Sequence, residues 1–181
     1  GHPLLQYKEP SKIDINQVIG KNKALISIFA GSRGSEINIL MPILFDFIKL
    51  MNKKYTDMTY VFHSTKEYAA LIKSFINKSD LNNCEVVSDN KIKSHILQRS
   101  VFAVAKSGTI SLEICNFKIP SIIIYKMNFI NFLIIKILVK TKFANIINIA
   151  AKKEVIPELL QGDCNPKNIS NKTIDFLDNP E

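Results

Sequence analysis

The sequence predicts an α/β fold: a single Rossmann-like, doubly wound parallel sheet with helices on both faces. Short runs rich in valine and isoleucine alternate along the chain with longer segments whose apolar residues recur every three or four positions. The short runs are almost continuously apolar, as expected of strands covered on both faces. A length of 181 residues fits one such domain.

The first half of the chain supplies three strand and helix pairs. The apolar run 24–29 predicts a strand, and the spacing of Ile37, Leu40, Met41 and Leu44 predicts a helix over 35–54. Pro42 falls inside this helix, where a proline can produce a kink. The same alternation continues with strand 58–64, helix 66–77, strand 84–88 and helix 91–100.

The second half continues the pattern with less regular spacing. VFAVA, residues 101–105, has the composition of a buried strand, and SGTISLEICNF turns into a helix within 107–117. PSIIIY at 120–125 predicts another strand, followed by helices at about 129–140 and 166–178. Ligands of such sheets bind at the carboxyl ends of the strands, so the loops Ala30–Ser35 and Ala105–Thr109 are the candidate binding loops.

Composition narrows the possible partners. Apolar residues make up 46% of the chain, enough for a sizeable core, and the net charge of +8 favours an anionic partner. Neither a run of basic residues nor a basic–aromatic RNA-binding motif is found, so no nucleic acid is expected as partner. The three cysteines and three histidines are scattered, which predicts reduced thiols in the cytoplasm, no disulfide framework and no metal site.

The segment 121–143 is the most apolar part of the chain. Its longest uncharged stretch, from Met127 to Ile135, is shorter than the roughly 20 residues of a membrane-spanning helix. Apolar residues around Phe129 and Leu133 are followed by lysines at 136, 140 and 142. This pattern fits either a helix that binds the membrane surface or a core helix with a wet edge.

In the first candidate loop, Gly31 and Gly34 allow the backbone to approach a ligand, and Ser35 is expected to cap the helix that follows. The helix N-terminus attracts a phosphate, and Ser32 and Arg33 lie beside it in sequence. The alternative for this loop alone is a capped turn with a solvated arginine.

The second loop favours the ligand interpretation. Ser107, Gly108 and Thr109 lead from a strand into a helix, and Glu113 follows one turn later. A carboxylate one turn behind a phosphate cradle can accept hydrogen bonds from ribose hydroxyls, which is the arrangement a nucleotide needs. The alternative for Glu113 is a structural ion pair with Lys118 or Lys106.

Several segments together resemble the lipid-A-disaccharide synthase family. They are AGSRGSEI, SGTISLE, IPSIIIYKMN and LVKTKFANIINIAAKKEVIPELLQ, after an opening GHP. The resemblance implies the donor-nucleotide half of a glycosyltransferase built from two Rossmann domains (GT-B). That family joins UDP-2,3-diacylglucosamine to 2,3-diacylglucosamine 1-phosphate and releases UDP, with no metal or other cofactor expected.

The resemblance also assigns roles by position. Gly31, Ser32 and Arg33 would face the phosphates, with Arg33 as a possible stabiliser of the leaving group. Ser107, Gly108 and Thr109 would cradle the pyrophosphate and Glu113 would hold the ribose. The remaining donor-pocket residues would be Tyr125, Lys126, Met127, Asn148, Glu158 and Gln161. Ile147 and Lys152 depart from the family pattern, which leaves the shape of the 145–153 loop and the role of Asn148 open.

The same resemblance sets expectations for the whole molecule. Residues 1–23 would lead in from an amino-terminal acceptor domain, and residues 24–181 would be the donor domain, shortened at its carboxy-terminal end. The catalytic base would lie in the other domain, so this chain alone would be inactive. Expected partners are the UDP-sugar, UDP, the acceptor lipid through the other domain and the membrane surface. The expected location is cytoplasmic, peripheral on the inner membrane of a Gram-negative bacterium.

Two rival interpretations remain at this point. One is another UDP-sugar enzyme of the same fold, such as a peptidoglycan glycosyltransferase or a 2-epimerase. The other is a non-catalytic basic module that binds membranes or nucleic acid. It would explain the net charge, but the spacing between Ser107-Gly108-Thr109 and Glu113 would then be a coincidence.

Overall fold

The computed structural model describes residues 24–128 and 143–179. Within them the chain forms six strands and six helices. The strands are β1 (Ala24–Phe29), β2 (Met58–His63), β3 (Cys84–Val87), β4 (Ser100–Lys106), β5 (Ser121–Tyr125) and β6 (Glu158–Leu160). The helices are α2 (Gly34–Asn52), α3 (Lys66–Asn77), α4 (Asn90–Arg99), α5 (Ile110–Asn116), α7 (Ile146–Ala151) and α8 (Pro166–Asp178).

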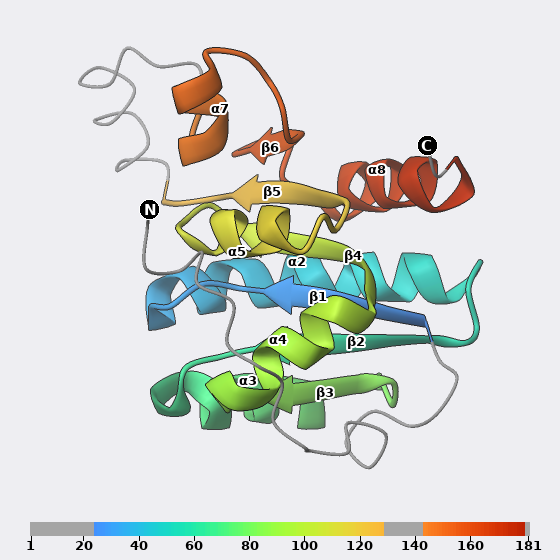
Figure 1. The fold of residues 1–181 in the computed structure, drawn as a ribbon. Helices are drawn as coiled ribbons and strands as arrows, with labels where there is room; N and C mark the ends of the chain where they lie inside the picture. The colour runs from blue at the N-terminus through green and yellow to red at the C-terminus, as the bar shows by residue number, and fades with distance from the viewer. Residues whose placement is uncertain (1–23, 129–142, 180–181) are drawn as a thin grey trace.

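The strands form one sheet in the order β3-β2-β1-β4-β5-β6, and every neighbouring pair is parallel. Helices cover both faces: α4 and α5 lie in front of the sheet in Figure 1 and α2 lies behind it. The chain moves outward from β1 in one direction and then from β4 in the other. The doubly wound α/β fold predicted from the sequence is therefore confirmed.

The two faces of β1 explain why its sequence is apolar at nearly every position. Ile26 and Ile28 pack with α2 residues in the larger core cluster. Phe29 belongs to a second cluster with Ile114 of α5, on the opposite face. All six residues of β2 are buried as well. A central strand that contacts helices on both sides has no wet face, so the alternating pattern of a half-buried strand does not arise.

Three local features differ from the sequence predictions. The short helix α7 and the three-residue strand β6 were not expected, because elements of six and three residues are too short to show a period. Arg33, and not Ser35, occupies the N-cap position of α2, and no side chain caps it. Helix α2 itself continues through Pro42 as one helix, as predicted.

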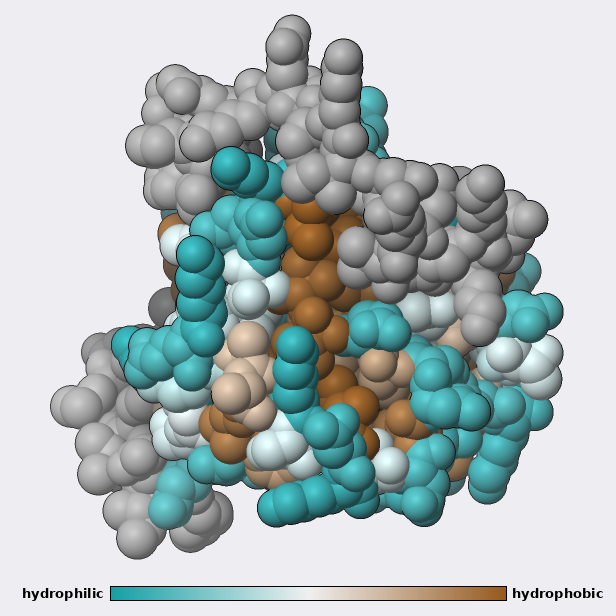
Figure 2. All heavy atoms as spheres, turned by 90° about the horizontal axis from the view of Figure 1, so that it is seen from below, coloured by the Kyte–Doolittle hydropathy of each residue, from teal (hydrophilic) through white to brown (hydrophobic). Residues whose placement is uncertain are grey.

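Other predictions fall outside the described residues: the lead-in 1–23, the helix at 129–140 and the apolar–lysine segment around Phe129 and Leu133. Within residues 24–128 and 143–179, none of the helices has the length and apolar character to cross a membrane. Seen from below, on the side of β3, α3 and α4, an apolar band shows between hydrophilic side chains (Figure 2). This agrees with the position of β3 at the edge of the sheet, where three of its four residues are not fully buried.

Candidate functional site

The carboxyl ends of β1, β2 and β4 open into one pocket of about 410 Å³. Both loops selected from the sequence contribute to it, as do the ends of β2 and α4. Its lining residues are Phe29, Gly31, Ser32, Arg33, His63, Ser64, Thr65, Asn90, Lys93, Lys106, Ser107, Gly108, Thr109 and Ile110. The pocket thus brings together six of the predicted binding residues from two loops more than 70 positions apart.

The first loop takes its shape from a glycine and a glutamate. Gly31 has a φ of +115°, a conformation that residues with a side chain rarely adopt. A Cβ at this position would lie 2.6 Å from Glu36 Oε2. The loop therefore folds tightly around the Glu36 carboxylate, and only glycine leaves room for it.

Glu36 connects three groups of the pocket lining: the Ser32 backbone, Arg33 and Lys106. Its carboxylate accepts a hydrogen bond from the Ser32 backbone N–H (3.1 Å), lies 2.8 Å from Lys106 Nζ and is 3.5 Å from Arg33 Nη1. Burial by itself would raise the pKa of Glu36, but the Lys106 ammonium, the Ser32 N–H and the Arg33 guanidinium together bring it below its ordinary value. Glu36 stays ionised and links the first loop to the end of β4.

The second loop is anchored by its buried serine. Ser107 N–H donates to the Ile124 carbonyl at 3.0 Å, and Ser107 Oγ donates to the Ala144 carbonyl at 2.7 Å. Gly108 and Thr109 are exposed at the pocket, and α5 begins directly after them. The Ser107 side chain is thus used to hold the loop, while the next two residues remain open to a ligand.

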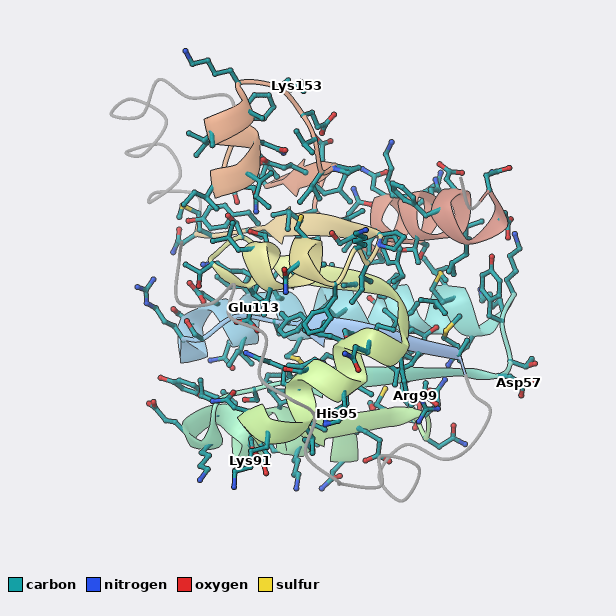
Figure 3. The ribbon with its side chains drawn as sticks, viewed as in Figure 1. Asp57, Lys91, His95, Arg99, Glu113 and Lys153 are labelled. Atoms are coloured by element: carbon teal, nitrogen blue, oxygen red, sulfur yellow. The ribbon has the colours of Figure 1, made fainter. Side chains whose placement is uncertain are left out.

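Glu113 lies on α5 one turn behind this loop, as predicted, on the front face in Figure 3. Its carboxylate pairs with Lys93 of α4, at 2.8 Å and 3.1 Å for its two oxygens. Neither Lys118 nor Lys106 is its partner; Lys106 pairs with Glu36. Lys93 lines the pocket and Glu113 lies behind it. Because a carboxylate can accept about four hydrogen bonds, the pair still leaves acceptor capacity on Glu113.

The charged side chains of the pocket lining are all positive. Arg33, Lys93 and Lys106 line it, and none of the lining residues is an aspartate or glutamate. The two carboxylates that neutralise these cations, Glu36 and Glu113, stand behind the wall. An anion that enters the pocket meets the cations first, so the site is built for a negatively charged ligand.

His63 is a wall residue that the sequence reasoning missed. Ser100 Oγ donates to the Ile96 carbonyl (2.9 Å), and Ser27 Oγ lies 2.7 Å from Ser100 Oγ and 3.0 Å from His63 Nε2. All three bonds form only if Ser27 donates to Ser100 and His63 Nε2–H donates to Ser27. The remaining nitrogen, Nδ1, is then an acceptor; it is buried and has no hydrogen-bond partner among the described residues.

His63 is also held neutral. Its ring stacks on Phe29 with centroids 4.3 Å apart, and it is 6% exposed. Burial, with a smaller contribution from the charge of Lys93, lowers the pKa of His63 to about 3. The imidazole therefore adds a neutral aromatic wall to the pocket.

The other predicted donor-site residues do not line this pocket. The Tyr125 ring lies under Lys106, 5.3 Å from Nζ. Lys126 Nζ donates to the Cys164 carbonyl at 3.3 Å. Gln161 Oε1 accepts a hydrogen bond from the Met127 N–H at 2.8 Å. Tyr125 thus supports a pocket residue, and the other three residues are engaged in contacts between β5 and the segment after β6.

Asn148 and Glu158 form the centre of a separate polar network beside α7. Asn148 Nδ2 donates to Glu158 Oε1 (2.6 Å) and to the Ile156 carbonyl (2.7 Å), and its Oδ1 accepts from the N–H groups of Val155 and Ile156. Glu158 also accepts from the N–H groups of Ala144 and Asn145. Asn148 is fully buried, so the network fixes the course of the 145–158 segment. Their contact with a donor sugar stays a prediction.

Three of the missed lining residues could have been found from the sequence, and Lys93 could not. His63, Ser64 and Thr65 lie at the carboxyl end of a predicted strand, and the rule that selected the other two loops applies to them equally. Lys93 lies inside a helix, and only the packing of α4 against α5 brings it to the pocket. Within the described residues, no cluster of three or more histidine, cysteine or acidic side chains could hold a metal ion, and all three cysteines are free.

Comparison with known proteins gives a consistent result. A family model described as lipid-A-disaccharide synthetase matches residues 1–181. The lipid-A-disaccharide synthase of Sulfurihydrogenibium sp. (strain YO3AOP1) is 34% identical and covers 98% of this chain, and that of Rickettsia prowazekii is 34% identical and covers all of it. The chain spans 49% and 48% of these two relatives, about half of their length.

Solved structures share the fold at low sequence identity. The S. aureus MnaA–UDP co-structure has a TM-score of 0.65 at 15% identity, covering 96% of this chain and 41% of that one. The E. coli ADP-heptose lipopolysaccharide heptosyltransferase II has a TM-score of 0.66 at 6% identity, covering 90% and 49%. The C-terminal domain of a Francisella tularensis group 1 glycosyl transferase has a TM-score of 0.57 at 15% identity, covering 94% and 85%. A UDP-GlcNAc 2-epimerase from Neisseria meningitidis is also similar, with a TM-score of 0.61 at 14% identity, covering 91% of this chain and 38% of that one. The likenesses thus include an epimerase and glycosyltransferases alike, so they establish the fold alone.

Proposed function

The chain belongs to the lipid-A-disaccharide synthetase family, and from this premise we propose that it binds the UDP-sugar donor of that glycosyltransferase. The reaction would join UDP-2,3-diacylglucosamine to 2,3-diacylglucosamine 1-phosphate and release UDP. The acceptor lipid and the catalytic base would come from a second domain, because we assign no residue of this chain as the base.

The observation that carries the proposal is the cationic pocket between two glycine-containing loops. Gly31 and Gly108 let the backbone approach a ligand, while Arg33, Lys93 and Lys106 supply positive charge without a carboxylate in the lining. A diphosphate fits this combination of backbone donors and cations. The volume of about 410 Å³ is in the range of small-molecule sites.

The chemical contribution of the pocket would be stabilisation of the leaving group. Negative charge accumulates on UDP as the bond to the sugar breaks, and fixed cations and N–H groups stabilise that charge more strongly in the transition state than in the ground state. Lys106, at the end of β4, provides such a fixed charge, and Arg33 of the first loop adds a second, more exposed cation. The proposal therefore includes no divalent ion and no cofactor.

Glu113 is the proposed ribose acceptor. Lys93 holds the carboxylate in place at 2.8 Å, and the acceptor sites that remain can take hydroxyl donors.

We also propose that this enzyme works at the cytoplasmic face of the inner membrane of a Gram-negative bacterium, since both substrates carry acyl chains. Support among the described residues comes from the end of the molecule around α7. Ile146, Ile149 and Val155 are 50%, 42% and 51% exposed, and Lys152 and Lys153 stand beside them; Figure 3 shows Lys153 at this end. Exposed aliphatic groups beside lysines suit an anionic lipid surface.

Ligand titration by calorimetry tests the donor-site proposal. The chain should bind UDP more tightly than ADP, and Glu113→Gln should weaken UDP more than 2′-deoxy-UDP. Equal affinity for UDP and ADP would contradict a uridine site. Equal losses for UDP and 2′-deoxy-UDP, and for 3′-deoxy-UDP, would make Glu113 a structural residue only.

Co-sedimentation with vesicles tests the membrane contact. Vesicles containing anionic lipid should retain the chain at low salt and release it at high salt, because the Debye length shortens. Ile146→Ser combined with Ile149→Ser should weaken this binding. Retention that does not depend on lipid charge, or that is unchanged by the double substitution, would contradict the proposal that the α7 surface binds the membrane.

A further inference from the structure

Lys106 is the least exposed of the three cations that line the pocket. It is the last residue of β4 and directly precedes Ser107. Its ammonium lies 2.8 Å from Glu36 Oε1 and 5.3 Å from the centroid of the Tyr125 ring, and its side chain is only 18% exposed. Two flanking groups therefore fix the position of this charge before any ligand arrives.

Arg33, the cation that the sequence singles out, is held far less firmly. Its side chain is 77% exposed, and its distance to Glu36 is 3.5 Å. Ordering a long exposed side chain costs conformational entropy, and exposed ion pairs are weakened by solvent. A ligand that relies on Arg33 has to order it, whereas Lys106 is already in place.

The position of Glu36, the ion-pair partner of Lys106, determines which N–H donors of the ammonium remain free. An ammonium has three N–H donors, and the ion pair with Glu36 uses one side of the group. Lys106 lines the pocket and Glu36 does not. The carboxylate is behind the cation, which leaves the pocket side of the ammonium for an anionic ligand.

We propose that Lys106 is the principal phosphate-binding cation of this pocket, and that Glu36 is the positioning residue that holds it between the two loops. This assignment rests on the proposed function, in that the phosphate belongs to a UDP-sugar. Lys93 is a different case, because it stands on α4 and pairs with Glu113. Lys106 adjoins the Ser107-Gly108-Thr109 loop and shares Glu36 with the Ser32 N–H, so it serves both phosphate loops.

The test measures the affinity of the full 181-residue chain for UDP, uridine and inorganic pyrophosphate by calorimetry. Lys106→Met keeps the length of the side chain and removes its charge. We expect it to weaken UDP and pyrophosphate by about tenfold and to leave uridine unchanged, as the loss of one charge-assisted hydrogen bond predicts. Lys78→Met is the matched control: Lys78 is exposed at the far end of α3 and its removal changes the net charge equally.

Each outcome decides the assignment. A loss confined to the phosphate ligands, absent in Lys78→Met, supports it. No loss for UDP, or an equal loss for uridine, overturns it, since the second result marks a general disturbance of the pocket. The proposed function fails separately if the unmodified chain binds pyrophosphate as tightly as UDP, and both fail if it binds neither.

Glu36→Gln tests the positioning role through a double-substitution cycle. Alone, it should weaken UDP about threefold, because Lys106 and Arg33 lose the charge that orients them. In the Lys106→Met background the same change should have a smaller effect, and uridine affinity should again stay constant. Tighter UDP binding in Glu36→Gln would mean that the carboxylate competes with the phosphate, and it would overturn the positioning role, as would full additivity.

Discussion

Two parts of the molecule carry the residues that the sequence assigned to the donor site, and they use their polar atoms in opposite ways. In the loop pocket, cations and loop backbone face an open volume with their carboxylates behind them. In the α7–β6 region, Asn148, Glu158 and Gln161 direct their polar atoms at each other and at nearby backbone. Figure 1 shows α7 and β6 at one edge of the sheet, away from α3 and α4.

The difference shows that the type of a polar residue does not tell whether its side chain is free to bind a ligand. A buried asparagine with four short hydrogen bonds stabilises the fold, and a ligand that took one of its atoms would have to replace a bond. A half-buried lysine at the pocket wall has donors left over. Ser107 belongs to both regions, because its hydroxyl donates to the Ala144 carbonyl. The network beside α7 therefore supports the second loop even without touching a ligand.

The largest effect is expected for Asn148→Ala. The substitution leaves the N–H groups of Val155 and Ile156 and a carboxylate oxygen of Glu158 without this partner, which should cost about 2–4 kcal/mol in the free energy of unfolding. Urea denaturation measures this cost. Asn171→Ala, on the exposed side of α8, is the control and should stay within about 0.5 kcal/mol. A stable Asn148→Ala variant with weaker UDP-sugar binding would place Asn148 in the ligand site and remove the contrast.

A pH effect of His63 comes next. Its pKa is about 3 in the folded chain and about 6.5 when unfolded, so between these values the unfolded state binds more protons and stability falls as the pH falls. From pH 7 to about pH 5 this should amount to about 2 kcal/mol. His63→Phe should lose less stability over the same interval in urea titrations at the two pH values. An identical pH dependence in both proteins would show that His63 is not buried as described.

Gly31→Ala and Gly162→Ala compare the two regions directly. Alanine at 31 must adopt a φ near +115° and contact Glu36 at 2.6 Å, which should cost about 1–2 kcal/mol and weaken UDP through displacement of the loop. A Cβ at Gly162 would meet nothing within 4 Å, so that variant should be neutral or slightly more stable. Thermal unfolding and UDP titration of both variants measure this. Equal behaviour would mean that the first loop adapts freely.

The smallest effect is expected for Arg33→Ala. Because this arginine is 77% exposed, its removal should weaken UDP by only about threefold, less than Lys106→Met. Calorimetry at low and moderate salt compares the two variants. A greater loss for Arg33→Ala than for Lys106→Met would make the exposed arginine the main phosphate contact and contradict the assignment of Lys106.

Local pattern was sufficient for the long elements. The recurrence of Ile37, Leu40, Met41 and Leu44 predicted α2 because a helix of 19 residues repeats its apolar face several times. The cap at Ser35 was wrong because α2 begins at Gly34, with Arg33 in the N-cap position and no side chain that caps it. Which residue occupies the N-cap position depends on where the loop ends and the helix begins. The conformation of Gly31 and the contact of the loop with Glu36 set that point.

The sequence by itself determined the parallel α/β fold, the two loops that line the pocket and the positions of Arg33 and Glu113, because these follow from apolar period, glycine placement and short motifs. Only the tertiary structure decided which charges line the pocket. Lys106 and Glu36 are 70 positions apart, and Lys93 and Glu113 are 20 apart; each pair forms because β1, β4, α4 and α5 pack together. Whether a charged side chain can serve as a binding group depends on the residues packed around it, and the packing of helices and strands decides which residues those are.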